Sequence, residues 1–105
     1  MVSAKYNATM VTMNDIRGRR EQILQIAARH GADRVRIFGS VSRGEASPAS
    51  DVDVLVHLAD QATLLDQIAL KHELEDLLGC TVDVVDDEAV HPALRDDVLA
   101  QAVAL

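Results

Sequence analysis

Few folds accommodate a segment such as residues 51–58, DVDVLVHL, in which every second side chain is aliphatic. Successive side chains of a β-strand point to opposite faces, so the pattern predicts a strand with two unlike faces. Its aliphatic face comprises Val52, Val54, Val56 and Leu58, and its opposite face comprises Asp51, Asp53, Leu55 and His57. Such a strand needs a hydrophobic layer on one side and presents carboxylates on the other.

Helical and strand patterns flank this segment. Helical spacing of apolar residues starts after Asn14 and Asp15, which are N-cap types, and Gly31 is placed to end that helix. A second helix is expected over residues 63–78, ending at Gly79, and a third from Pro92. Short alternating runs predict strands over residues 34–38 and 81–85. The last helix is expected to present one apolar face, made of Leu94, Val98, Ala102 and Leu105.

The order of these elements predicts an α/β (α+β) fold, in which helices pack on one face of a small mixed β-sheet. Residues 39–50 are rich in Gly, Ser and Ala and form the expected loop. Residues 1–13 are polar and non-periodic, so we expect a flexible N-terminal extension there. Residues 14–105 are expected to form a single domain.

Composition excludes several classes of function. The 105 residues carry 17 acidic and 10 basic side chains, which gives a net charge of −7. That balance argues against direct binding to nucleic acid or to anionic membranes. No apolar run approaches the roughly 20 residues of a membrane span, and no secretory signal is recognisable, so we expect a cytoplasmic protein. The single cysteine, Cys80, cannot build a disulfide framework and is expected to be a buried filler.

The charge is also unevenly distributed along the chain. Residues 1–43 hold eight basic and three acidic side chains, whereas residues 44–105 hold two basic and fourteen acidic ones. One interpretation is a molecule with a phosphate-binding side and a cation-binding side. The other is a set of ordinary solvated helix faces.

Three aspartates lie in predicted strands, where this residue type is normally depleted. Asp51 and Asp53 are two residues apart, so their side chains share a face with Cα atoms about 7 Å apart. Asp83 has the same relation to the aliphatic residues of its own strand. If the two strands are neighbours, three carboxylates converge, and their repulsion favours a bound cation such as Mg²⁺. The alternative is the solvated face of a half-exposed sheet.

A Gly-Ser pair, Gly39 and Ser40, directly follows the first predicted strand. Small residues at a strand end let the backbone approach a ligand closely. If Ser40 opens a helical turn, its free N–H groups and its hydroxyl suit a phosphate, which Arg43 could also reach. A phosphate cradle and a carboxylate cluster would then lie on consecutive elements, as nucleotide chemistry requires.

The segments FGSVSRGEASPASDVDVLV and TVDVV resemble the signature of the polymerase-beta-type nucleotidyltransferase superfamily. The chain length and helix order are similar to its minimal nucleotidyltransferase branch, over nearly the whole chain after the extension. The resemblance implies that Gly39 and Ser40 hold the nucleotide's phosphates. It also implies that Asp51 and Asp53 bind two Mg²⁺ ions, with Mn²⁺ as a substitute, and that Asp83 completes the metal site and activates the attacking hydroxyl.

The same resemblance implies a protein partner. Many minimal nucleotidyltransferases are encoded beside a small helical HEPN toxin, a ribonuclease, and form a toxin–antitoxin pair with it. The expected activity is the transfer of AMP from ATP to a tyrosine of that toxin, with this chain as antitoxin, in a homodimer or hetero-oligomer. Two alternatives stay open: a small-molecule transferase of the aminoglycoside type, and a non-catalytic module that only binds the toxin.

Overall fold

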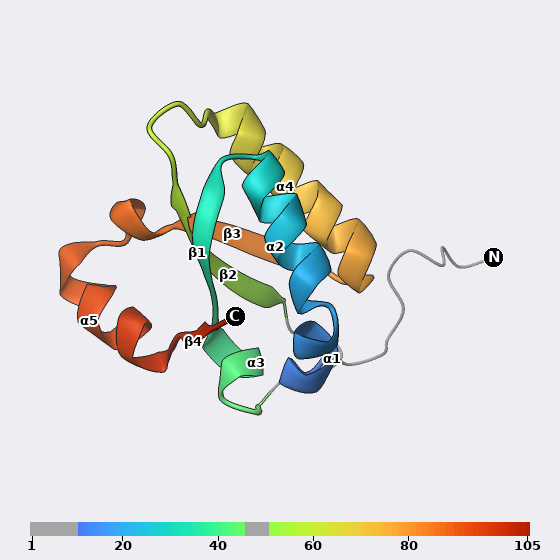
Figure 1. Ribbon diagram of the computed structural model, residues 1–105. Helices are drawn as coiled ribbons and strands as arrows, with labels where there is room; N and C mark the ends of the chain where they lie inside the picture. Colours follow the sequence, from blue (N-terminus) through green and yellow to red (C-terminus); the bar gives the residue numbers. More distant parts are fainter. Residues whose placement is uncertain (1–10, 46–50) are drawn as a thin grey trace.

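The computed structural model describes residues 11–45 and 51–105 and contains a four-stranded sheet flanked by helices (Figure 1). The strands are β1 (Ala32–Phe38), β2 (Val52–Leu58), β3 (Val82–Asp86) and β4 (Val103–Ala104), in the spatial order β3-β2-β1-β4. β1 pairs antiparallel with both β2 and β4, whereas β2 and β3 are parallel. The predicted α/β class with a small mixed sheet is confirmed.

Two helices cover one face of this sheet. α2 (Arg20–Arg29) packs against β1, α4 (Leu64–Leu78) packs against β3, and the two helices contact each other (Figure 1). The remaining helices are α1 (Met13–Gly18), α3 (Gly39–Ser42), the short 3₁₀ helix η1 (Asp87–Ala89) and α5 (Pro92–Gln101). Within the described ranges, no helix has the length and apolar character that crossing a membrane requires.

The hydrophobic core lies between the sheet and this helical layer. Val52, Val54 and Val56 of β2 are each at most 1% exposed, as their alternation predicts. They belong to one buried cluster with residues of α2, β1 and α4. Leu55, on the opposite face of β2, is also completely buried, and it pairs in register with Arg36 of β1 and Val85 of β3. The acidic face of the sheet is therefore only partly solvated.

The N-terminal helix starts earlier than expected. The N-cap is Thr12 and not Asn14 or Asp15. The Thr12 hydroxyl oxygen accepts a hydrogen bond from the Asp15 N–H, and the Asp15 carboxylate accepts one from the Thr12 N–H at 2.9 Å. This capping box satisfies two backbone donors that a helix start leaves free. Val11 and Met13 pack against the core. Residues 1–10 of the expected extension lie outside the described residues.

The single helix expected before Gly31 is divided into α1 and α2. The break falls at Arg19, whose φ of −114° and ψ of 18° are not helical. Gly18 precedes it, and glycine costs about 1 kcal/mol relative to Ala in a helix. The break lets Ile16 of α1 and Ile23 of α2 both reach the core.

The end of the chain also differs from expectation. α5 ends at Gln101, and Val103 and Ala104 form β4 beside β1, where the Leu105 N–H donates to the Val35 carbonyl at 3.0 Å. The continuous apolar face predicted for residues 94–105 is thus wrong. Residues 103–105 extend here because they pair with the backbone N–H and carbonyl groups at the open edge of β1. The spacing of apolar residues within the segment contains no information about that edge. Leu94 of α5 remains 57% exposed.

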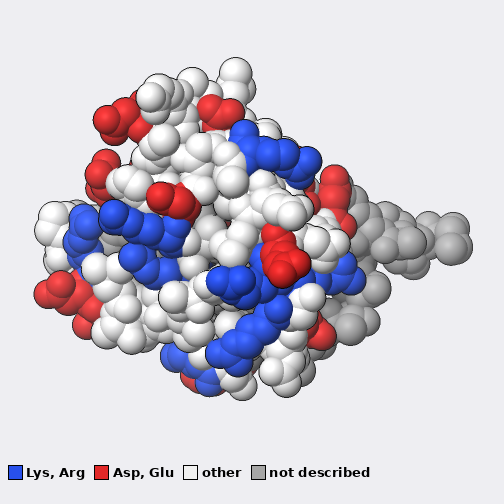
Figure 2. Space-filling view, viewed as in Figure 1, with Lys and Arg blue, Asp and Glu red and all other residues white. Residues whose placement is uncertain are grey.

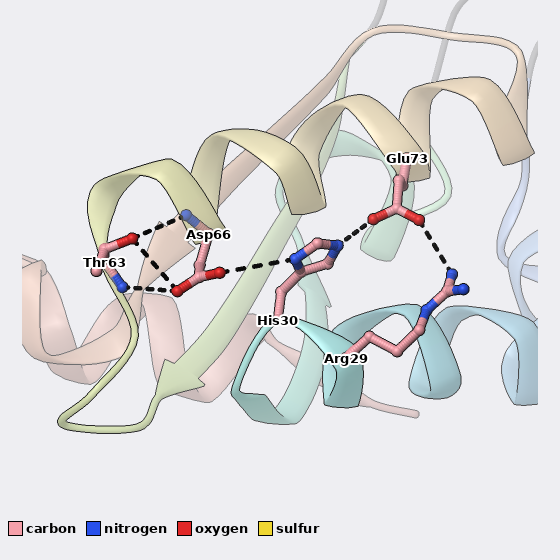
Figure 3. A network of polar contacts seen from close by, with 5 residues as sticks. All are labelled: Arg29, His30, Thr63, Asp66 and Glu73. Atoms are coloured by element: carbon pink, nitrogen blue, oxygen red, sulfur yellow. Dashed lines mark hydrogen bonds and ion pairs between the residues drawn. The ribbon is translucent and has the colours of Figure 1, made fainter.

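A polar network joins the C-terminal end of α2 to α4 (Figure 3). His30 lies between Asp66 and Glu73, with its Nε2 against the Glu73 carboxylate and its Nδ1 3.9 Å from Asp66 Oδ1. Arg29 Nη2 donates to Glu73 Oε1 at 3.0 Å. Asp66 also closes a capping box with Thr63 at the start of α4. The network therefore connects the two helices that cover the sheet.

β1 contains one residue more than its partner strand requires. The register with β2 shifts between Asp33 and Arg36, and Arg34 within this bulge has a φ of +50°. The extra residue keeps Ala32, Val35 and Ile37 on the core side although their spacing is irregular. The bulge thus places Arg36 and Phe38 on the face of the sheet opposite the core, which is also the face of Asp53.

Arg34→Gly is expected to stabilise the protein by about 0.5–1 kcal/mol. An L-residue in the left-handed region costs roughly 1–2 kcal/mol, and part of the gain is offset by the extra unfolded-state entropy of glycine. Thermal unfolding followed by circular dichroism checks this. Arg34→Ala, which keeps the strained φ, is the control and should bring no such gain; equal melting temperatures for the two variants would contradict the interpretation.

Candidate active site

The sheet pairs two of the three predicted carboxylates in register. Asp53 of β2 pairs in register with Asp83 of β3 on one side and with Phe38 of β1 on the other. Asp51 lies two residues earlier on the same face as Asp53. Adjacent strands are about 4.8 Å apart, so Asp53 and Asp83 are direct neighbours. The two strands are therefore neighbours, as the prediction required, and Asp53 and Asp83 lie side by side.

Asp53 bears the electrostatic cost of this arrangement. Its partial burial raises the pKa of its carboxyl, and the negative charges of Asp83 and Asp51 raise it further, while the Arg43 guanidinium opposes them. Like charges directly opposite each other on a sheet are destabilising. A bound cation would remove this repulsion.

The Gly-Ser turn is in direct contact with the same carboxylate. Gly39 has a φ of +74°, and a Cβ placed on it would lie 2.2 Å from Asp53 Oδ2 and 3.1 Å from Asp53 Cγ. Only glycine leaves room for Asp53 at this distance. Gly39 and Ser40 begin α3. The first N–H groups of a helix have no partners within the helix and point outward from its N-terminal end. The turn predicted to bind phosphate therefore lies directly against Asp53, one of the carboxylates predicted to bind metal.

Arg43 is placed at the other end of α3. Its Nε donates to Glu45 Oε1 at 3.2 Å and its Nη1 to Gln101 Oε1 at 3.0 Å. These bonds hold its charge near Asp53 and link α3 to the end of α5. The predicted role of Arg43 toward a nucleotide stays a prediction, since it would require exchange of at least one of these partners.

A cavity of about 410 Å³ adjoins this end of α3. Its lining includes Asn14 and Arg17 of α1, together with Ser42 and Arg43. Neither Asn14 nor Arg17 was a candidate from the sequence, because a lone polar residue on a short helix carries no motif. Two guanidinium groups, those of Arg17 and Arg43, therefore line this cavity at the C-terminal end of α3.

Charges of both signs are interspersed on the face of the molecule shown in Figure 2. Groups of Lys and Arg atoms lie across its middle and lower parts, with Asp and Glu between them. The uneven distribution along the sequence thus does not produce a uniformly basic face in this view. Fold topology mixes the two halves because β1, from the basic half, pairs with β2, from the acidic half.

The donor set fits a hard divalent cation. Carboxylate oxygens are the ligands that Mg²⁺ prefers, and Mg²⁺ typically binds through one or two carboxylates plus substrate phosphates. Among the described residues, no three His, Cys, Asp or Glu side chains already enclose a metal position. Asp51, Asp53 and Asp83 would accordingly hold the metal together with a nucleotide, with Gly39 leaving space for the Asp53 carboxylate.

His57 belongs to a separate cluster on the same sheet face. Its Nδ1 lies 3.1 Å from Asp87 Oδ1, and Arg36 Nη1 lies 3.8 Å from Asp87 Oδ2. The contact with Asp87 raises the pKa of His57. His57 is four residues beyond Asp53 on β2, about 13 Å along the strand, which is consistent with a structural role.

Cys80 lies partly buried between α4 and β3 and packs against the core, as expected. Burial raises the pKa of its thiol, so the unreactive protonated form dominates near neutral pH. It is therefore not a candidate nucleophile.

Comparison with known proteins shows the family of this chain. Residues 20–105 match the family model described as a nucleotidyltransferase domain. The chain belongs to this nucleotidyltransferase family. A Methanocaldococcus jannaschii protein named as a protein adenylyltransferase is 41% identical to this nucleotidyltransferase over 93 residues, covering 89% of this chain and 97% of the relative. The protein adenylyltransferase MntA of Thermococcus cleftensis is 36% identical over 99 residues, covering 90% and 96%.

Solved structures show the same fold. A minimal nucleotidyltransferase superposes on this nucleotidyltransferase with a TM-score of 0.82 and 49% identity, covering 90% of this chain and 97% of that one. A toxin–antitoxin structure with AMP-PNP superposes with a TM-score of 0.69 and 26% identity, covering 80% and 69%. The minimal branch expected from the sequence is confirmed.

Proposed function

We propose that this nucleotidyltransferase transfers AMP from ATP to a tyrosine hydroxyl of a HEPN-type toxin and thereby acts as its antitoxin. The observation that carries the proposal is the contact between Gly39 and the Asp53 carboxylate, with Asp83 in register beside it. The turn that would bind the phosphates then lies against the carboxylate that would hold the metal. Relatives named as protein adenylyltransferases support a protein acceptor, and the toxin–antitoxin structures support a toxin as that acceptor.

The residues divide the task between nucleotide and acceptor. Gly39 and Ser40 would bind the β- and γ-phosphates through backbone N–H groups and the Ser40 hydroxyl. Asp51 and Asp53 would hold Mg²⁺, which when bound offsets phosphate charge and the repulsion between the two carboxylates. Arg43, beside Asp53, would add positive charge near the phosphates.

Asp83 would act on the acceptor hydroxyl. Asp83 lies one strand spacing from Asp53, and its carboxylate would orient the hydroxyl and accept its proton as the new bond forms. A bond forms between the acceptor oxygen and the α-phosphorus, and the bond from that phosphorus to the oxygen bridging to the β-phosphate breaks. Pyrophosphate leaves with that electron pair, and AMP remains on the acceptor.

Co-expression tests the proposal. This chain is produced together with the small helical protein encoded by the neighbouring gene, and the intact mass of that protein is measured. We expect an increase by at least one AMP, lost when the acceptor tyrosine is replaced by Phe. An unmodified partner in a stable complex would instead support the non-catalytic binding module, and AMP transfer only to small molecules would support the aminoglycoside-type alternative.

A further inference from the structure

Asp83 lies on β3, whose outer edge has no neighbouring strand among the described residues. On its other side β3 pairs with β2, where the Val52 N–H donates to the Thr81 carbonyl at 3.0 Å. The N–H and carbonyl groups of Val82 point away from β2. The carbonyl of Val84 also points away from β2. β3 has only five residues, and its Asp83 is repelled by Asp53 of β2. Pairing with β2 alone therefore fixes the position of this edge strand weakly.

Three side chains of α4, spaced four residues apart, bind this free edge. Gln67 Nε2 donates to the Val84 carbonyl at 2.9 Å, and Lys71 Nζ donates to the Val82 carbonyl at 2.7 Å. Glu75 accepts the Val82 N–H at 3.1 Å. Residues i, i+4 and i+8 lie on one side of a helix, so α4 acts as a substitute for a further strand. We name Gln67, Lys71 and Glu75 the edge clamp.

Glu75 is the centre of the edge clamp. It is only 4% exposed, and its Oε2 accepts both the Val82 N–H and Lys71 Nζ, the latter at 2.7 Å. Burial acts to raise the pKa of its carboxyl, but the bonds from Lys71 and Val82 outweigh it and keep the pKa low. Glu75 is therefore an ionised acceptor that binds the backbone of Val82, the residue before Asp83.

We propose that Glu75 is a positioning residue of the active site, which with Gln67 and Lys71 holds Asp83 against the repulsion of Asp53. The clamp contacts fall on Val82 and Val84, the two neighbours of Asp83, so they fix the strand on both sides of that carboxylate. The inference rests on the proposed function, since Asp83 matters as a metal and acceptor residue only there.

A double-mutant cycle on metal binding tests this role. Free Mn²⁺ is measured by electron paramagnetic resonance in the presence of AMP-PNP, which requires no turnover. Glu75→Ala is expected to weaken Mn²⁺ binding roughly tenfold in the wild-type background, the low end for losing an outer-shell partner. In an Asp83→Asn background the same change should cost less than about twofold, because both substitutions act through one carboxylate.

Matched variants separate positioning from stability. Glu73→Ala, on the same helix, removes contacts to Arg29 and His30 but none to β3, and should leave Mn²⁺ binding unchanged. Glu75→Gln keeps an acceptor for the Val82 N–H and should retain most of the affinity. Gln67→Ala is the milder variant should Glu75→Ala fold poorly, and it should weaken Mn²⁺ binding about two- to threefold. Amide exchange at Val82 should accelerate in Glu75→Ala and not in Glu73→Ala.

The outcomes distinguish this inference from the proposed function. Equal losses for Glu75→Ala in the two backgrounds, or equal losses for Glu73→Ala and Glu75→Ala, overturn the positioning role and leave the proposed transfer intact. Failure of the wild type to bind Mn²⁺ with AMP-PNP overturns both. Coupled losses without AMP transfer to the toxin overturn the proposed acceptor alone.

Discussion

Asp53→Asn is expected to abolish AMP transfer and, in the metal-free protein, to raise the melting temperature by a few degrees. The amide keeps the volume of the side chain but loses the charge that would bind the metal. We expect transfer to fall at least about a thousandfold, the scale seen when one group that stabilises a transition state is removed. Assays use Mg²⁺, ATP and the co-purified toxin, and a double variant with Asp51→Asn that still transfers AMP would contradict the metal-binding role.

The gain in stability follows from the sign of the pKa shift. Burial and the charges of Asp83 and Asp51 raise the pKa of Asp53 in the folded protein above its ordinary value of 3.8. The native state therefore binds the proton more tightly than the unfolded state, and stability falls as the pH rises through the window between those two values. The penalty is fully present near neutral pH and absent below the ordinary value.

Thermal unfolding at several pH values checks this sign. The Asp53→Asn variant should melt above the wild type near neutral pH, and the difference should disappear in acid. Asp96→Asn, at an exposed position of α5, is the control for general loss of negative charge and should have little effect. A variant less stable than the wild type near neutral pH would show that Asp53 makes favourable contacts that outweigh the repulsion.

Gly39→Ala is expected to cost about 2–5 kcal/mol of stability and to eliminate transfer. A side chain at a φ of +74° is strained by roughly 1–2 kcal/mol, and forcing Asp53 away from a Cβ 2.2 Å from its Oδ2 adds an overpacking cost of about 1–3 kcal/mol. Displacing Asp53 would also move the carboxylate that is proposed to bind the metal. Chemical denaturation and the transfer assay measure the two effects.

Gly44→Ala supplies the matched control. Gly44 has nearly the same backbone conformation, with a φ of +72°, but a Cβ there meets nothing within 4 Å. It should show the backbone strain alone, about 1–2 kcal/mol, and retain transfer. In an Asp53→Ala background the difference between the two glycine variants should shrink. If Gly39→Ala and Gly44→Ala behave alike, close approach of Asp53 is not the reason for Gly39.

The sequence was sufficient for features that depend on near neighbours. The alternation over residues 51–58 identified β2 and its buried face, and Gly79 marked the end of α4, where it adopts the left-handed conformation. The Gly-Ser pair and the aspartates of residues 51–53 predicted the candidate site residues. Each of these signals lies within about ten residues, where backbone geometry and hydrophobic spacing determine structure directly.

Only the tertiary structure decided how these elements meet. Four contacts join segments that are distant in the sequence. They are the register that sets Asp53 beside Asp83, the contact of Gly39 with Asp53, the pairing of Val103 and Ala104 with β1, and the binding of Glu75 to Val82. Strand register and the covering of a free edge depend on which backbone groups remain unsatisfied after the sheet has formed. Local sequence therefore predicted which residues belong to the candidate site, whereas the pairing of distant backbone groups determined how closely their charges approach.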